Sequence, residues 1–434
     1  YNFGSYNRAA RDKPKKSGAQ GAKRDAEGRK ILDKNKLFTT IEFTPDGTEL
    51  IICQNDSELK VLDIKTAKFK ELGAKLSVVD PSKTVPHYIT QIAMCHDGPY
   101  FACSDSNRCV SLFKKHFVMA LGQIDQEKPK EWQFSGKIRS HQIEIAAICF
   151  GKSIDENDQV QQRLFSVGRD RRCFEYDVRE ARANTELPIL REFMVEMEAH
   201  PTCCAWYPQL DFKEGILLTT NDEYKIKLWN PTTQTSRRTC LGPTYGGEIA
   251  KLKLLEQMNG EKYMCYATES KVIGLIKLPL DGNPHKTMGL IAHPNEVTDL
   301  CVTSDGKYVF TCGGDDLAVN MWGVDVTPIN QACAMGGEGI EPFVNLIEGG
   351  RDGQTFQDMK DFFYYSMIKA QVEDTTKTRK LTAHVPVEQL PNLMCAMGYY
   401  PTDHEIKCMI DEVRQCAMSN EGRTTTHVSL DTFI

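Results

Sequence analysis

The sequence lacks the features of a membrane or secreted protein. No apolar run approaches the roughly 18 residues that a membrane-spanning helix needs, and no signal peptide is visible. Because the chain begins at Tyr1 rather than at Met, we interpret it as a fragment, so the missing signal excludes little. Its sixteen cysteines include no CxxC pair, and only Cys203 and Cys204 are adjacent. This scatter excludes a clustered zinc site and favours a reducing, cytoplasmic compartment in which most thiols are small buried hydrophobes.

Motifs of known enzyme chemistry are also missing. The sequence contains no GxGxxG, GxxxxGK[ST], HExxH or GxSxG segment. The glycine-rich segments GGEGIEPF and GGRDG have no strand-to-helix phosphate cradle around them, and we interpret them as linker. The net charge of −6 argues against a general nucleic-acid binder. We therefore predict a protein that is not an enzyme, has no catalytic or metal site and no cofactor, and binds neither nucleic acid nor membrane.

The composition is that of an ordinary globular protein, except at the start of the chain. With 434 residues, 41% apolar and 26% charged, the chain is long enough for two or three domains. Residues 1–30 differ, because nine basic and only three acidic side chains lie between Arg8 and Lys30. We interpret this segment as a basic tail or linker. The alternative is a basic arm that lies on an acidic surface such as tubulin.

Short apolar runs separated by turn residues recur between residues 31 and 335. The first copy, LFTTIEFTPDGTELIICQNDSELKVLDI, has an Asp-Gly turn that suits a tight hairpin. Further copies begin at His87, Ser140, Ala199 and Ala292, and a weaker copy lies between the last two. Repeats of about 40 to 55 residues made of short strands predict a β-propeller, whose blades stack around a central channel.

The segments resemble WD40 repeats. In that pattern a histidine, an aspartate in the turn before the last strand and an aromatic residue on that strand form a buried hydrogen-bonded network. The matching residues are His293, Asp316 and Trp322 in the last copy, His141, Asp170 and Tyr176 in the third, His200 and Trp229 in the fourth, and Asp56 in the first. Glu223 replaces the aspartate of the fourth copy, and the expected hydroxyl falls at Gly168 and Gly314. We therefore expect the networks to be incomplete.

Six blades are recognisable, whereas propellers of this class usually close with seven. The missing strands are expected either upstream of Tyr1 or from the segment EPFVNLI near Phe343. Alternatively, the chain holds the second of two tandem propellers. These possibilities remain open at the level of the sequence.

After a glycine-rich connector at residues 336–354, the apolar period becomes helical over residues 355–434. Gly398 suits the end of a helix, and Thr402 with Glu405 forms a capping box at the start of the next. Four helices in two pairs with methionine-rich inner faces resemble a calmodulin-type EF-hand pair that is truncated at its end. The predicted fold class is therefore mainly β plus α, with a WD40 β-propeller followed by a helical, degenerate EF-hand-like pair.

The two loops of this helical region lack the ligands that calcium needs. Position twelve, which should be a glutamate, falls at Gln389 in the first loop and at Thr432 in the second. We interpret the frame as kept for packing. The methionine stripe is either internal core or a groove for a partner helix, lined by Met394, Met397, Ile406, Met409 and Ile410.

The segments GGRDGQTFQDMKDFFYYSMIKAQ and DTTKTRKLTAHVPVEQLPNLMCAMGYYPTDHEIKCMIDEV resemble the cilia- and flagella-associated protein 251 family, and the resemblance extends roughly over residues 31–434. That family is a WD-repeat subunit of the calmodulin- and spoke-associated complex, with tandem propellers and a degenerate EF-hand-like tail. The resemblance implies a structural scaffold in the axonemal cytoskeleton of the motile cilium or flagellum. There it would dock a radial spoke base on the doublet microtubule and support motility.

The partners that the resemblance implies are radial spoke subunits, the other subunits of that complex, and calmodulin. The alternative is a cytosolic calcium-responsive WD-repeat adaptor. The empty calcium loops favour the scaffold.

Overall fold

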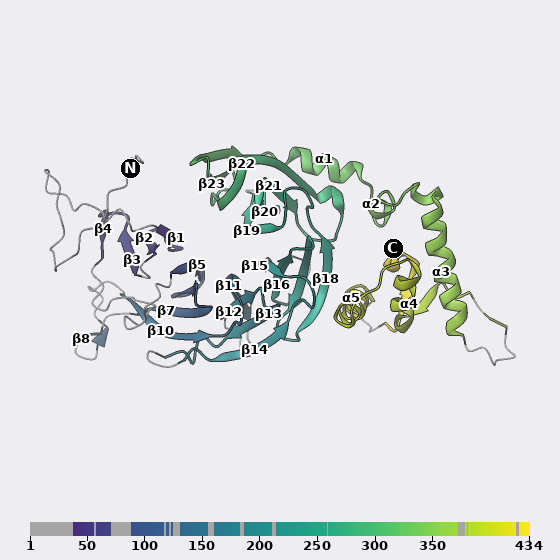
Figure 1. The fold of residues 1–434 in the computed structure, drawn as a ribbon, viewed down its shortest axis with the longest axis horizontal. Coiled ribbons are helices and arrows are strands. Elements are labelled where there is room, and N and C mark those ends of the chain that lie inside the picture. The colour runs from purple at the N-terminus through teal and green to yellow at the C-terminus, as the bar shows by residue number, and fades with distance from the viewer. Residues whose placement is uncertain are drawn as a thin grey trace, which may run out of the picture.

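A computed structural model describes residues 38–434 apart from 56–57, 71–87, 117–118, 121–122, 125–130, 155–159, 183–185, 211–213, 258, 372–377, 380 and 422–424. The basic segment 1–30 and Asp56 therefore lie outside the described residues. Five larger antiparallel sheets follow one another along an arc, and the helices lie at one end of the molecule (Figure 1).

The first four sheets are four-stranded blades. Blade one comprises β1 (Phe38–Phe43), β2 (Glu49–Gln54), β3 (Leu59–Asp63) and β4 (Lys68–Phe69). Blade two comprises β5 (Ile89–Met94), β6 (Tyr100–Asp105), β7 (Cys109–His116) and β10 (Glu131–Arg139), with the small hairpin β8 (Met119–Ala120) and β9 (Gln123–Ile124) inserted. Blade three comprises β11 (Ile145–Ile154), β12 (Val160–Gly168), β13 (Arg172–Tyr176) and β14 (Ile189–Met194). Blade four comprises β15 (Pro201–Tyr207), β16 (Ile216–Asn221), β17 (Lys225–Asn230) and β18 (Thr235–Leu241).

The fifth sheet has six strands and contains two blades, because one long strand is shared. Its strands are β19 (Ile249–Glu256), β20 (Lys262–Thr268), β21 (Ser270–Lys277), β22 (Thr287–Val302), β23 (Tyr308–Gly313) and β24 (Val319–Gly323). The first half of β22 is the outer strand of blade five and pairs with β21. Its second half, from Val297 to Val302, is the inner strand of blade six and pairs with β23. All six predicted repeats are therefore blades, and the predicted propeller followed by helices is confirmed.

Alternating side chains explain why the blades stack. Successive residues of a strand point to opposite faces, so each blade presents an apolar face to each neighbour. Five buried clusters fill the spaces between blades one and two, two and three, three and four, four and five, and five and six. In the first of these, the rings of Phe101 and Phe113 stack with centroids 4.6 Å apart. Ten of the sixteen cysteines are buried, as predicted for small hydrophobes.

The segment EPFVNLI contains a helix and not a strand, so it does not supply the missing strands. The chain forms α1 (Thr327–Met335) after blade six and then the short α2 (Glu341–Val344). Pro342 lies in the first turn of α2, where its missing N–H costs no helical hydrogen bond. Pro342 and Val344 are buried, so the apolar run is used for packing.

The C-terminal region contains two helical units joined by a small sheet. Its elements are η2 (Gly350–Asp352), α3 (Gln354–Ala370), β25 (His384–Pro386), η3 (Val387–Gln389), α4 (Leu390–Ala396), α5 (Asp403–Glu421), β26 (His427–Ser429) and α6 (Leu430–Phe433); the remaining 3₁₀ turn, η1 (Pro284–Lys286), lies in blade five. β25 and β26 pair through Val385 and Val428. A core of Phe363, Met367, Val385 and Leu393 joins these elements, with Leu430 and Phe433 packed against it.

The predicted ends of the helices are confirmed. Gly398 follows α4 with a φ of +89°, a left-handed conformation that favours glycine. The backbone N–H of Thr402 donates to the Glu405 carboxylate at 3.0 Å, and the N–H of Glu405 donates to the Thr402 hydroxyl at 3.3 Å. In the described part of the chain, no helix is both long and apolar enough to span a membrane.

Candidate interaction site at the junction of propeller and tail

Blade three contains a complete network of buried polar groups. His141 Nδ1 lies 3.0 Å from the Asp170 carboxylate, and His141 Nε2 lies 2.7 Å from the Ser166 hydroxyl. The same hydroxyl lies 2.7 Å from the hydroxyl of Tyr176. The expectation of an incomplete network at Gly168 is therefore wrong. The hydroxyl comes from Ser166, two residues earlier on the same face of β12, and Gly168 leaves the space that the His141 ring occupies, since a Cβ there would collide with His141 Nδ1.

Blade six repeats this arrangement with different side chains. His293 Nδ1 lies 2.7 Å from Asp316, and Nε2 lies 2.8 Å from the Thr311 hydroxyl. The indole N–H of Trp322 donates to the same hydroxyl at 3.0 Å. Thr311 thus supplies the hydroxyl that was expected at Gly314. Trp322 is only half-buried.

Blade four does not form this network, although the sequence pattern pairs His200 with Trp229. His200 Nδ1 lies 2.9 Å from the carbonyl oxygen of Arg169 in blade three. The Trp229 indole N–H donates to the Thr219 hydroxyl at 3.2 Å. Glu223 replaces the aspartate that is expected to hold the imidazole, and no described side chain of this turn forms a hydrogen bond with the His200 ring. Asp222 accepts instead from the backbone N–H of His200 at 2.9 Å.

The inner strands of blades one to five line a central cavity of about 720 Å³. Lys253 of β19 lies 4.0 Å from Glu42 of β1 across this channel. Burial raises the pKa of Glu42 above the usual value for a glutamate. Within the described residues, no three His, Cys, Asp or Glu side chains gather as a metal site would require.

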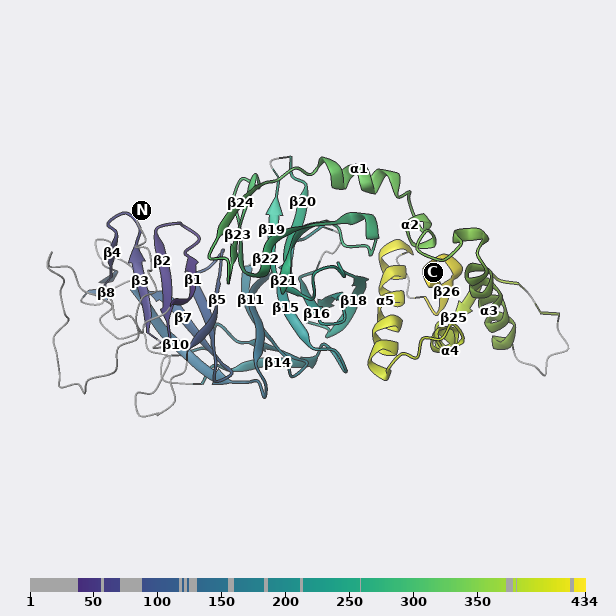
Figure 2. The same ribbon diagram turned by 45° about the horizontal axis from the view of Figure 1, so that its top comes forward.

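The most extensive contact between the two parts of the protein is made by α5, which packs along β18 of blade four (Figure 2). Glu405, Cys408 and Glu412 follow one another at intervals of three and four residues, so they share one face of the helix. Cys408 is buried in the same cluster as Trp229 of blade four. Glu412 accepts hydrogen bonds from the hydroxyls of Ser236 at 2.8 Å and Thr239 at 2.6 Å. The contact therefore runs over more than two turns of the helix.

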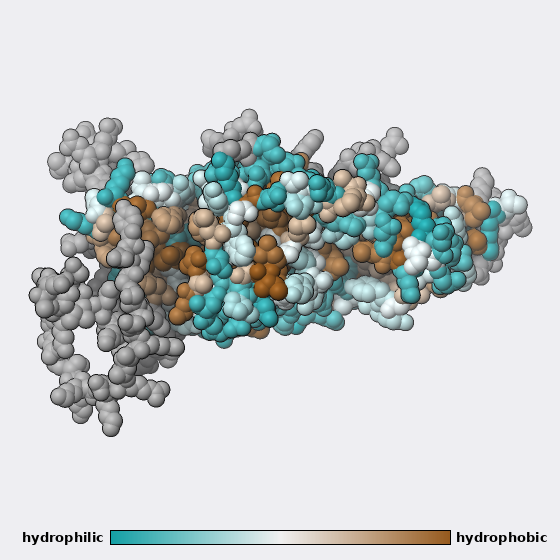
Figure 3. Space-filling view, turned by 90° about the horizontal axis from the view of Figure 1, so that it is seen from above, coloured by the Kyte–Doolittle hydropathy of each residue, from teal (hydrophilic) through white to brown (hydrophobic). Residues whose placement is uncertain are grey.

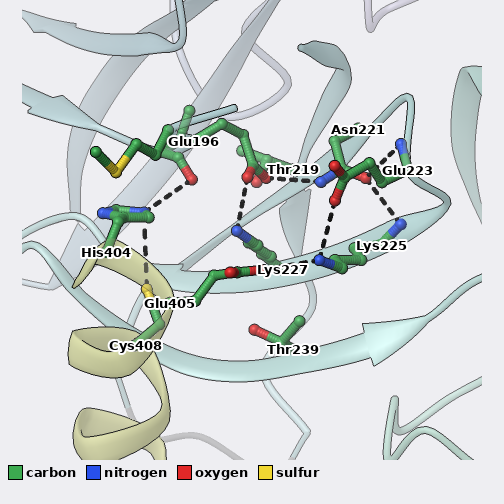
Figure 4. A network of polar contacts seen from close by, with 12 residues as sticks. Glu196, Thr219, Asn221, Glu223, Lys225, Lys227, Thr239, His404, Glu405 and Cys408 are labelled. Carbon is green, nitrogen blue, oxygen red and sulfur yellow. Dashed lines mark hydrogen bonds and ion pairs between the residues drawn. The ribbon is translucent and has the colours of Figure 1, made fainter. Parts of the chain in front are cut away.

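An ion pair at the rim fixes the start of α5 (Figure 4). The ammonium of Lys225 lies 3.0 Å from Glu405 and also 3.0 Å from Glu223 of its own blade. The Tyr399 hydroxyl donates to Glu405 at 2.7 Å. Burial of Glu405 opposes its ionisation, but the hydrogen bonds from Thr402, Tyr399 and Lys225 outweigh it and lower its pKa to about 2. The two carboxylates raise the pKa of Lys225 in turn.

A second ion pair lies beneath the helix and is almost completely buried. Lys227 donates to Glu196 at 2.7 Å, and their side chains are only 4% and 6% exposed. The side-chain amide of Asn221 donates to the same carboxylate at 3.0 Å. Burial raises the pKa of Glu196 despite these partners. Isolated buried charges are very unfavourable, so each member of this pair depends on the other.

His404 covers this pair from the side of the tail. Its ring stacks on Trp229 with centroids 6.0 Å apart, and its Nε2 lies 3.4 Å from the carbonyl oxygen of Val195. Burial and the nearby ammonium of Lys227 lower the pKa of His404. The neutral imidazole is therefore the form that fits this contact.

The structure does not assemble the five predicted groove residues into a separate groove for a partner helix. All of them are partly buried: Met394, Met397, Ile406, Met409 and Ile410. The cavity of about 660 Å³ beside α3 and α4 is lined by residues such as Phe362, Tyr365 and Tyr400, and includes none of the five. Helical periodicity identified an amphipathic α5, but the face that contacts blade four carries Glu405, Cys408 and Glu412 and not the predicted apolar stripe. This second face was not predicted from the sequence. The spacing of Glu405, Cys408 and Glu412 by three and four residues is the pattern that could have identified it.

Comparisons with known proteins support both parts of the fold. Residues 282–323 match the family of the WD domain, G-beta repeat, and residues 354–434 match the family described as CFAP251 C-terminal domain. Cilia- and flagella-associated protein 251 of Tetrahymena thermophila is 39% identical over 93% of this chain and 42% of its own length. The Mus musculus protein of the same name is 34% identical over 93% of this chain and 30% of its own length. The Chlamydomonas reinhardtii protein is 22% identical over 79% of this chain and 30% of its own. The chain thus spans less than half the length of these relatives.

Proposed function

We propose that this chain, which belongs to the family of cilia- and flagella-associated protein 251, acts as a rigid scaffold in the axoneme of the motile cilium or flagellum. Its association with cilia and flagella follows from the family. The finer proposal is that it docks the base of a radial spoke on the doublet microtubule and supports motility. Its proposed partners are radial spoke subunits, other subunits of the calmodulin- and spoke-associated complex, calmodulin and tubulin.

The observation that carries the scaffold proposal is the junction between blade four and α5. The ion pair of Glu405 with Lys225, the buried Cys408 and the hydrogen bonds that Glu412 accepts from Ser236 and Thr239 join the tail to the propeller. A part that transmits force between a spoke and a microtubule must keep its domains in a constant orientation. This junction does so with side chains from both domains, and the connector alone would not.

The loops of the tail support a scaffold over a calcium-responsive adaptor. Counting back from Gln389 and Thr432 as position twelve, the paired Val385 and Val428 are both at position eight. The two loops are thus in the same register, as in an EF-hand pair. Their ligand positions, however, hold residues such as Thr378 and Thr382, which cannot replace carboxylates in a calcium cage. We infer that the EF-hand-like frame serves packing and that the chain is not an enzyme.

Cryo-electron tomography of axonemes tests the proposal. Cells without this protein should lose density at the base of one class of radial spokes. Re-expression of the intact protein should restore that density, and a variant with Lys225→Met should restore less of it, because the ion pair that ties Glu405 of the tail to blade four is lost. Normal spoke bases in cells without the protein would contradict the proposal.

A further inference from the structure

Blade six has one strand fewer than the other blades. In blades one to five the third strand pairs on its outer side with a fourth, in the order β3–β4, β7–β10, β13–β14, β17–β18 and β21–β22. The equivalent strand of blade six is β24, which among the described residues pairs only with β23. Its outer edge therefore offers backbone N–H and C=O groups for a further strand.

The faces beside this edge are also uncovered. The strands β16 and β2, second in their blades, have six buried residues each, whereas β23 has two. β24 has no buried residue, and its Val319 and Met321 are 67% and 62% exposed. Both side chains point away from blade five, because Trp322, which follows Met321 and points to the opposite face of the strand, joins the cluster that faces blade five.

Blade one, on the other side of the gap from blade six, also has an uncovered apolar surface. Ile41 and Phe43 of β1 are 52% and 56% exposed, whereas β15, the inner strand of blade four, has no exposed residue. None of the clusters formed by described residues joins blade one to blade six. Figure 3 shows apolar side chains reaching the surface in several places over the propeller. Large exposed apolar areas of this kind usually mark a contact.

The order of strands along the chain identifies what covers these faces. In each described blade the outer strand leads directly to the inner strand of the next blade, as β4 leads to β5 and β18 to β19. By the same order, a strand that led into β1 would be the outer strand of the blade before blade one. The chain after blade six cannot take this place, because it continues into α1, whose Ile329 is buried in the cluster between blades five and six.

We infer that polypeptide preceding β1 in the same protein supplies a seventh blade between blade six and blade one, together with the strand that pairs with β24. The relatives contain enough chain for this, since the matched region covers only 42% of the Tetrahymena protein and 30% of the mouse protein. The inserted blade needs apolar side chains on both faces, one against Val319 and Met321 and the other against Ile41 and Phe43. The inference concerns how the ring is closed and does not depend on the proposed function.

Hydrogen exchange tests this inference on two proteins, the 434-residue chain and the full-length protein that contains it. Outward amides of β24 should exchange rapidly in the 434-residue chain and at least tenfold more slowly in the full-length protein, because exchange reports strand pairing. Equal exchange of β24 in the two proteins would overturn the inference. So would protection in the 434-residue chain that rises with its concentration and accompanies a dimer in light scattering, since the occupant would then be a second copy.

A pair of charge substitutions provides an independent readout. Met321→Lys should lower the melting temperature of the full-length protein and leave that of the 434-residue chain unchanged, because the side chain is covered only in the former. Leu317→Lys is the matched control, since Leu317 is 91% exposed in the turn before β24 and should be neutral in both proteins. An equal effect of Met321→Lys in both proteins would exclude a seventh blade at this face. Protection of β24 that occurs only in whole axonemes would assign the face to another subunit.

Discussion

The buried pair of Glu196 and Lys227 permits a quantitative test of the propeller surface on which α5 lies. At an effective dielectric constant of about 20, two unit charges at their separation of 2.7 Å attract by roughly 6 kcal/mol. Much of this gain offsets the desolvation of the two groups, so the net contribution of the pair is small. Removal of one partner leaves the other charge buried and uncompensated, which costs about 3–5 kcal/mol.

We therefore expect Lys227→Met to lower the free energy of unfolding by about 3–5 kcal/mol. The double variant with Glu196→Met and Lys227→Met should recover most of this loss, because neither side chain then carries a charge. Urea denaturation followed by tryptophan fluorescence measures both, and Trp229 lies close enough to report on the site. The matched control is Arg172→Met, which breaks an ion pair with Glu192 whose side chains are 46% and 42% exposed, and which should cost about 0–1 kcal/mol.

Two results would refute this reasoning. If Lys227→Met unfolds at the same urea concentration as the parent protein, the pair is not buried as described. If the double variant is as unstable as the single one, the loss comes from packing and not from an uncompensated carboxylate. Limited proteolysis of the same variants should release the tail more rapidly from Lys227→Met than from the control, because α5 covers the pair.

Three further predictions address the rest of the fold. Trp229→Ala should cost about 3–5 kcal/mol in urea denaturation, as expected for a fully buried tryptophan, whereas the half-buried Trp322 should cost about 2 kcal/mol; equal losses would mean that blade six is as well covered as blade four. The lowered pKa of His404 means that the unfolded chain binds a proton more readily than the docked one, so the stability from this contact is complete above the unfolded pKa and decreases as the pH falls below it. Proteolysis of α5 should thus accelerate between pH 7.5 and 5.5, and His404→Asn should remove that pH dependence; an unchanged profile in the variant would exclude His404 as its cause. Finally, calorimetry of the 434-residue chain should detect no micromolar calcium site, because neither loop has a glutamate at position twelve and Glu421, at position one of the second loop, is the single carboxylate at the side-chain ligand positions; a saturable isotherm would contradict the assignment of the loops.

Local patterns in the sequence determined most of the secondary structure. Alternating apolar residues and turns such as Asp46–Gly47 specify short strands, and the six repeats of this unit all became blades. The capping box of Thr402 and Glu405 and the glycine after α4 were also readable, because each depends on residues within one turn of the chain. The pairing of His141 with Asp170, and of His293 with Asp316, was readable from the WD40 pattern, because within each blade a single strand hairpin brings the two residues together although their separations are 29 and 23 residues.

Contacts between distant segments were decided only by the tertiary structure. The hydroxyls of Ser166 and Thr311 reach their histidines because of the register between neighbouring strands, which turn residues alone do not reveal. Glu405 and Lys225 are 180 residues apart, so no periodicity could have paired them. A helical period predicts the apolar stripe of Ile406, Met409 and Ile410 on α5. The face that contacts blade four instead carries Glu405, Cys408 and Glu412, because the face that is covered depends on which surface is within reach. Here the propeller lies within reach, and for that reason the tail packs on blade four.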